Sequence, residues 1–81
     1  MRVYYARRFT KARRHDVFEA LRKDSYLRAI VNAAFLVDAR KDHAALLIAN
    51  ELKRRGHHRT PNGMSCYTFS SIRVALIGWP Q

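Results

Sequence analysis

Apolar residues recur at helical spacing along most of this chain, and only three glycines and two prolines interrupt the pattern. The pattern is clearest over residues 42–55, where Asp42 is placed to cap the first turn and Gly56 follows the last one. A spacing of i, i+3, i+4 and i+7 marks one face of a helix. Four residues of this segment have that spacing: Ala45, Ile48, Ala49 and Leu52. The chain is therefore predicted to fold mainly as α-helices.

The same periodicity predicts further helices on both sides of this one. The first covers residues 11–24, and the second covers residues 25–39 with Ser25 as its N-cap. The second helix is apolar around most of its circumference, which predicts that it is the central, buried helix. The last helix begins after Thr68 or Ser70 and ends at the Gly-Trp-Pro sequence near the C-terminus.

The connection between the last two predicted helices contains the turn sequence Pro61-Asn62-Gly63. Short extended arms on either side of this turn predict a small β-hairpin. The expected fold is a mainly α, compact three- to four-helix domain with this hairpin between the last two helices, like a helix-turn-helix or winged-helix domain. The 81 residues make a single domain, residues 1–81. Within it, residues 1–14 are a basic N-terminal arm or a short strand, and residues 42–78 are a helix–hairpin–helix unit.

The charge of the chain is strongly unbalanced, because sixteen lysines and arginines stand against six acidic residues, giving a formal charge of +10. An excess of this size in a small domain indicates a polyanionic partner. No acidic residue follows Glu51, so the end of the 42–78 unit is uniformly basic. The candidate nucleic-acid contacts in this unit are Lys53, Arg54, Arg55, His57, His58, Arg59, Thr68, Ser70, Ser71 and Arg73. The candidates in the N-terminal arm are Arg7, Arg8, Arg13 and Arg14.

The last predicted helix presents its first turn beside this basic region, which is the geometry with which a helix reads the major groove of DNA. Ser70 and Ser71 can hydrogen-bond to phosphates or base edges there, and Arg73 is long enough to reach a guanine. The expected function is binding of nucleic acid, with duplex DNA as the first choice. The expected location is the cytoplasm, in association with the nucleoid.

Other kinds of site find little support in the sequence. The single cysteine, Cys66, cannot form an intramolecular disulfide and suits a reducing cytoplasm. His57 and His58 are adjacent and lack a third ligand, so no metal and no cofactor is expected. No carboxylate stands near the serines to orient a nucleophile and its base, so the chain is not expected to be an enzyme. No apolar stretch reaches the ~18 residues of a membrane span, and no secretory signal is expected.

Three segments of residues 42–80 share their order and spacing with a known family. Residues 48–56 read IANELKRRG, residues 60–63 read TPNG, and residues 67–76 read YTFSSIRVAL. This pattern resembles the recombinase domain of large serine recombinases, although Lys53 replaces an Asn of the family and Tyr67 replaces a Trp. The 41 residues before this match are not expected to hold the catalytic resolvase domain of that family. The resemblance therefore implies a non-catalytic DNA-contacting module, such as a regulator or accessory factor of a phage or mobile element.

Two other classes of function stay open at this point. Structured RNA would satisfy the same positive charge, so an RNA-binding protein is one alternative. A phage-type inhibitor that binds a host protein is the other, because Leu46 and Leu47 lie opposite the main apolar stripe of residues 42–55. The same two leucines are a candidate surface for a homodimer.

Overall fold

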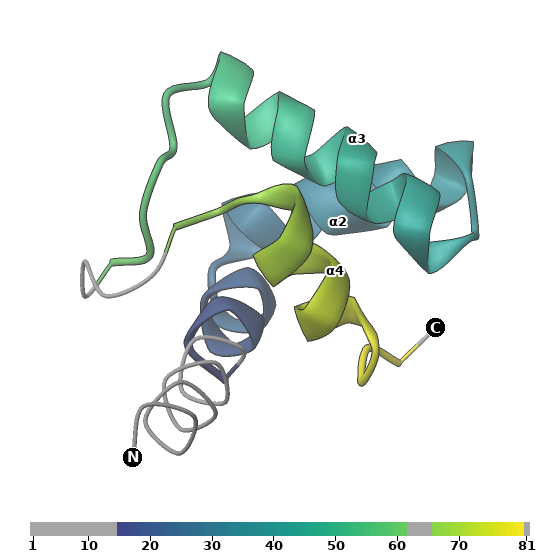
Figure 1. Cartoon of the computed structure of the whole chain (residues 1–81), viewed down its shortest axis with the longest axis horizontal. Coiled ribbons are helices and arrows are strands. Elements are labelled where there is room, and N and C mark those ends of the chain that lie inside the picture. The colour runs from purple at the N-terminus through teal and green to yellow at the C-terminus, as the bar shows by residue number, and fades with distance from the viewer. Residues whose placement is uncertain (1–14, 62–65, 81) are drawn as a thin grey trace, which may run out of the picture.

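The computed structural model of the chain describes residues 15–61 and 66–80. Within these ranges a helix covers residues 15–23, and three more follow: α2 (Ser25–Val37), α3 (Lys41–Arg54) and α4 (Phe69–Leu76) (Figure 1). The prediction of a mainly helical fold is confirmed. The predicted N-terminal arm or strand, with its four candidate arginines, lies outside the described residues, as does most of the Pro61-Asn62-Gly63 turn.

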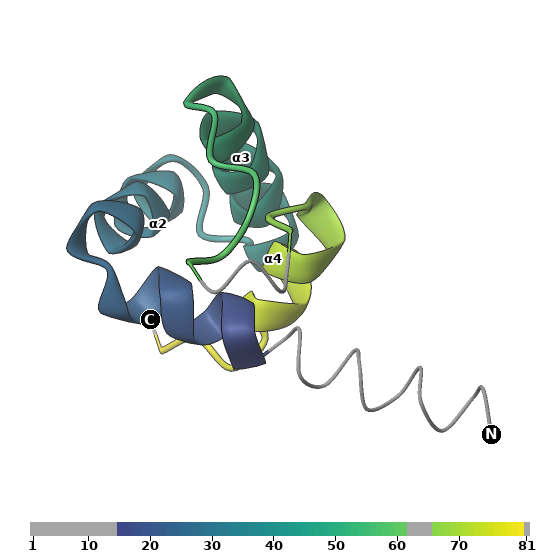
Figure 2. The same ribbon diagram turned by 90° about the vertical axis from the view of Figure 1, so that its left-hand side faces the viewer.

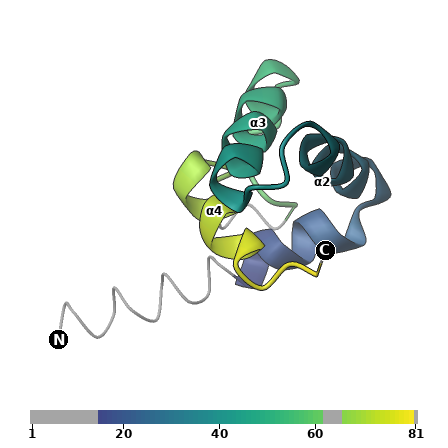
Figure 3. The same ribbon diagram turned by 90° about the vertical axis from the view of Figure 1, so that its right-hand side faces the viewer.

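The helices form a small bundle around one core. α2 and α3 are joined by residues 38–40 and make a helical hairpin, and α4 packs against α3. Figure 2 and Figure 3, taken from opposite sides, both show α3 at the top of the bundle and the helix over residues 15–23 at the bottom. α4 buries Ile72, Ala75 and Leu76, while Ser70, Arg73 and Ile77 are exposed, so one side of α4 is open to solvent.

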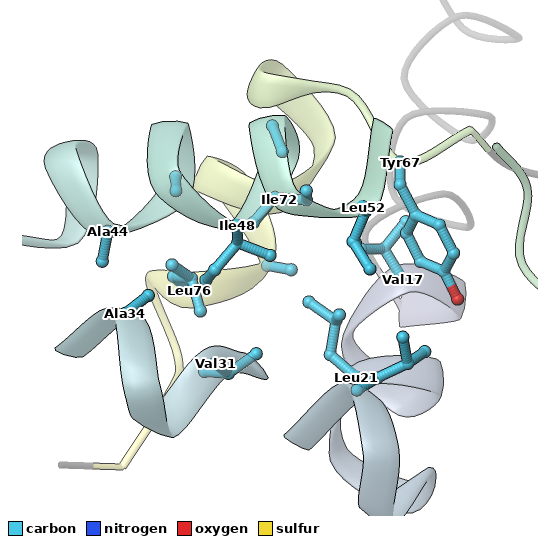
Figure 4. Packing of buried hydrophobic residues seen from close by; sticks show 14 of the residues in the cluster. Val17, Leu21, Val31, Ala34, Ala44, Ile48, Leu52, Tyr67, Ile72 and Leu76 are labelled. Atoms are coloured by element: carbon cyan, nitrogen blue, oxygen red, sulfur yellow. The ribbon is translucent and has the colours of Figure 1, made fainter. Parts of the chain in front are cut away.

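The central helix of the bundle is α3, and the prediction that the second helix is central is wrong. α3 packs against both α2 and α4, and it buries Ala44, Ala45, Ile48, Ala49 and Leu52. Figure 4 shows Ile48 and Leu52 of α3 directed toward labelled side chains of the other helices. α2 buries only Leu27, Val31 and Ala34 among its residues, while Leu36 and Val37 are 89% and 76% exposed. The second helix has two apolar sides, and the fold covers just one of them.

Two of the predicted N-caps also differ from the structure. Asp24, not Ser25, caps α2, because its carboxylate accepts hydrogen bonds from the backbone N–H groups of Tyr26 and Leu27 at 2.9 and 3.2 Å. α3 begins at Lys41 with no side-chain cap, so Asp42 lies inside its first turn rather than before it. An aspartate in the first turn still stabilises the helix through its dipole.

The end of α3 agrees with the prediction. Gly56 has a φ of +78°, the left-handed conformation that glycine adopts without steric cost. Its N–H donates to the carbonyl of Lys53 at 3.1 Å, and the N–H of His57 donates to the carbonyl of Leu52 at 2.9 Å. These two bonds form a Schellman motif, which satisfies the last carbonyls of the helix.

α4 is short but well capped at both ends. Thr68, one of the two predicted caps, accepts a hydrogen bond from the N–H of Ser71 at 3.2 Å. In return the N–H of Thr68 donates to the hydroxyl of Ser71 at 2.9 Å, which completes a capping box. At the other end, the ammonium group of Lys41 donates to the carbonyls of Ile77 and Trp79 at 3.1 and 3.4 Å. A cation at this position complements the negative end of the helix dipole.

The predicted β-hairpin is not found in the described residues. The two arms make one isolated antiparallel bridge, Arg59 to Cys66, and the N–H of Tyr67 donates to the carbonyl of His58 at 3.0 Å. Thr60, the next residue, is buried, and its hydroxyl donates to the carboxylate of Asp16 at 2.6 Å. Pro61, which follows, has no N–H to donate to a strand partner. The described part of the connection is therefore anchored to the first helix.

Tyr67 closes the core between this connection and the helix over residues 15–23. Its ring is 8% exposed, and its buried hydroxyl has no hydrogen-bond partner among the described residues. Loss of hydration on burial, together with the nearby carboxylates of Asp16 and Asp24, raises the pKa of Tyr67 to about 12. The phenol is thus held neutral well beyond the usual range of tyrosine.

We expect Tyr67→Phe to leave stability at neutral pH unchanged, or to raise it by up to about 1 kcal/mol, because it removes an unsatisfied buried hydroxyl. A raised folded-state pKa stabilises the protein below the unfolded pKa of 10.0 and loses that contribution as the pH rises through about 12. The phenylalanine variant should therefore lose less stability than the wild type over this range. Urea unfolding of the variant and the wild type at neutral and alkaline pH measures both effects. A large loss of stability for Tyr67→Phe at neutral pH would mean that the hydroxyl has a partner.

Candidate nucleic-acid interface

The predicted basic turn at the end of α3 is divided between two sides of that helix. Arg54 and Arg55 both bind the carboxylate of Glu51, at N–O distances of 2.5 Å, and Arg55 also donates to the hydroxyl of Tyr26 on α2. These hydrogen bonds from Arg54 and Arg55 lower the pKa of Glu51 to about 2. Both arginines are therefore engaged on the α2 side of α3.

Lys53 lies on the opposite side of α3, the side that faces α4. It shares a stripe at i, i+4, i+7 and i+11 with Asp42, Leu46 and Ala49, and Asp42 is in contact with α4. Lys53 is exposed and has no acidic partner in residues 15–61 and 66–80. Its ammonium group is available for an external anion.

Arg73 lies on α4 and is bound to α3. Its Nε donates to Oδ1 of Asp42 at 3.0 Å, and its side chain is 54% exposed. Asp42 precedes Glu51 by nine residues, so the two acids are about 14 Å apart along the axis of α3. Arg73 is therefore near one end of α3, while Arg54 and Arg55 are at the other. The structure does not bring the predicted arginines together on one face.

The hydroxyl side chains at the start of α4 also differ in whether they are free to hydrogen-bond to a ligand. Ser71 donates to the carbonyl of Cys66 at 2.7 Å and takes part in the capping box with Thr68. The hydroxyls of Ser71 and Thr68 are thus used to hold the helix start. Ser70 is exposed and has no hydrogen-bond partner among the described residues, so it is the one predicted hydroxyl free to bind a ligand.

The predicted residues between α3 and the bridge are on the surface. His57, His58 and Arg59 are all exposed. The ring of His57 lies 5.5 Å from that of Tyr26 between centroids, which places His57 toward α2. Arg59 is bridged to Cys66, and the chain from Cys66 leads directly into α4. Of the three, Arg59 is tied closest to the start of α4 by the backbone.

Two exposed cations were missed by the sequence prediction. Arg22 follows the buried Leu21 of the first helix, and Arg28 follows the buried Leu27 of α2. Neither has an acidic partner in the part of the chain that the structure describes. Helical periodicity places both residues off the core stripe, and this signal could have identified them.

The described residues contain no group of three or more side chains of the types that hold a metal ion. In the same residues no helix is long and apolar enough to cross a membrane.

Comparisons with other proteins add no family to this description. No protein-family model matches the chain, and no curated protein and no solved structure matches it. The likeness of residues 42–80 to the recombinase domain therefore stays a prediction from the residues alone.

Proposed function

We propose that this chain is a non-catalytic protein that binds duplex DNA through the open side of α4. The proposed contact surface, called the α4 face below, consists of Lys53, Arg59, Ser70 and Arg73. The observation that carries the proposal is the exposed, capped start of α4 in a chain with a net charge of +10. The backbone of such a helix start favours anions, and the excess of cations favours polyanions.

In this proposal α3 and α4 act as a variant helix-turn-helix with a long connection, and α4 is the recognition helix. The first turn of α4 enters the major groove, where Ser70 reaches a phosphate or base edge and Arg73 reaches a guanine. Lys53, on the α4 side of α3, binds the flanking phosphate backbone. Arg54 and Arg55 are not part of this surface, because Glu51 and Tyr26 hold them on the side of α2.

The Arg73–Asp42 ion pair gives this proposal a sharp test, because Asp42 competes with DNA for the guanidinium group. Asp42→Asn removes that competitor and a negative charge beside the DNA, so affinity for duplex DNA is expected to rise by about 3- to 10-fold. Adding Arg73→Ala to Asp42→Asn is expected to abolish the gain. Fluorescence anisotropy with a labelled duplex measures both effects.

The matched control for Asp42→Asn is Glu19→Gln. It removes the same charge from an acid that is also paired, here with Lys23 at 2.8 Å on the helix over residues 15–23. If the α4 face binds DNA, Glu19→Gln raises the affinity for duplex DNA less than Asp42→Asn does. Equal gains for the two variants would mean that DNA responds to net charge alone, and the α4 face would lose its assigned role.

The same assay separates DNA from the other two classes of partner. Unlabelled duplex RNA of the same sequence is added as competitor, because the deep and narrow major groove of RNA does not admit a helix. RNA that competes better than DNA would overturn the assignment to DNA and leave an RNA-binding protein. A failure of both nucleic acids to bind at low salt would point to a protein target instead.

A further inference from the structure

Five of the exposed large apolar side chains gather on a surface that borders the α4 face. They are Tyr26, Val37, Leu46, Leu47 and Phe69, with exposures of 45%, 76%, 50%, 39% and 39%. They line two neighbouring hollows, of about 410 Å³ between α2 and α3 and about 530 Å³ between α2, α3 and the start of α4. Val37 and Leu47 line both hollows, so the surface is continuous. We call these five residues the apolar patch.

The apolar patch follows from the sequence of the helical hairpin. α2 carries apolar residues on two sides, and α3 covers only the side with Leu27, Val31 and Ala34. Leu46 and Leu47 lie outside the buried stripe of α3. Contiguous apolar surface of this kind on a small protein marks a site of interaction with another macromolecule.

The charges around the apolar patch differ from those of the rest of the chain. Three of the six acidic residues line its two hollows: Asp38, Asp42 and Glu51. Each of these acids is bound by an arginine of the same chain: Arg40, Arg73, and the pair Arg54 and Arg55. The rim of the apolar patch is thus nearly neutral, in a chain whose net charge is +10. A nucleic acid has little electrostatic reason to bind there.

We propose that the apolar patch binds a second copy of this chain, forming a twofold homodimer. Two molecules of +10 charge repel each other, and the repulsion is weakest where the surfaces that meet are neutral and apolar. A twofold axis near Val37 and Leu47 pairs the patch with itself, as an isologous interface requires. This proposal does not rest on DNA binding.

The same axis also separates the most basic ends of the two patches. Tyr26 and Arg55 lie at one end, beside the C-terminus of α3, and Asp38 and Asp42 lie at the other, beside its N-terminus. A twofold operation sets each end of one molecule against the opposite end of its copy. The arginine end, where Arg54 and Arg55 share one carboxylate, is therefore kept away from the arginine end of the copy, which favours this arrangement over a parallel one.

The test is the oligomeric state of the full chain, measured by sedimentation velocity over a range of concentrations after nuclease treatment. The wild type is expected to form dimers. Leu47→Asp sets a carboxylate at the residue shared by both hollows and is expected to weaken the dimer by ~10-fold or more, because a buried unpaired charge is costly. Val37→Asp, at a side chain that is 76% exposed, gives a second variant in case Leu47→Asp fails to fold.

The matched control is Leu36→Asp, which makes the same change on α2 at a residue that is 89% exposed and lines neither hollow. It is expected to leave the dimer intact. Rising salt should tighten the dimer, since it screens the repulsion between the two positive chains. A wild type that stays monomeric at every concentration, or equal effects of Leu36→Asp and Leu47→Asp, would overturn the proposal.

Discussion

Replacing Ile48 by alanine is expected to lower the free energy of unfolding by about 3 kcal/mol. Ile48 is fully buried in α3, where its side chain lies between those of α2 and α4 (Figure 4). Truncation removes apolar contact with both neighbours and leaves a cavity that the short α4 cannot fill without breaking its caps. Because small domains have total stabilities of roughly 5–15 kcal/mol, the loss is a large share of the whole.

The expected loss corresponds to a decrease in Tm of about 12–24 °C for a domain of this size. Thermal unfolding followed by circular dichroism measures it, and urea unfolding gives the free energy. The control is Leu36→Ala, a truncation at an exposed leucine of α2, for which a change within about 0.5 kcal/mol is expected. If the two variants were equally stable, α3 would not be the centre of the core.

The helices that could be predicted are those whose signals are local. α3 has its apolar stripe, its terminal cations and Gly56 within one short segment, so its end was predicted to within one residue and its N-cap to within two. The N-cap of α2 was harder, because Asp24 and Ser25 are adjacent and both residue types cap helices. Such a choice depends on tertiary packing as well as on local propensity.

The features that could not be predicted depend on residues far apart in the sequence. The Thr60 hydroxyl, which anchors the connection to the first helix, donates to Asp16 across 44 positions. The hydrophobicity of the second helix was visible, but which of its sides another helix covers was not. A periodic pattern of apolar residues predicts that one face of a helix is buried, but it does not predict which element packs against that face.

In the candidate interface, too, contacts between residues near in sequence could be predicted and contacts between distant residues could not. The pairing of Arg54 with Glu51 spans three positions on one helix and could have been predicted from spacing. The pairing of Arg73 with Asp42 spans 31 positions, and that of Arg55 with Tyr26 spans 29. These distant partners decide which cations are free. The sequence therefore indicates how much positive charge a partner can meet, and the fold decides where.

Affinity for duplex DNA is expected to fall by about 100-fold when the salt concentration rises from ~50 to ~200 mM, if about four phosphates are contacted. Each neutralised phosphate releases counterions and adds about 0.9 to the slope of log affinity against log salt. The α4 face supplies Lys53 and Arg59 to this count, and other exposed cations such as Arg22 or Arg28 are available to add to it. Anisotropy titrations at several salt concentrations give the slope.

Two single-residue variants test which side chains contribute to the slope of log affinity against log salt. Lys53→Ala is expected to reduce it by about one, because one phosphate contact is lost. Arg54→Ala is expected to change it less, because Glu51 holds that side chain on the α2 side of α3, away from the α4 face. A larger change at Arg54 than at Lys53 would move the DNA contact from α4 to the end of α3. Rising salt is expected to weaken DNA binding and to tighten the dimer. Measuring DNA affinity and dimer affinity on the same set of variants therefore shows which of the two interactions each residue serves.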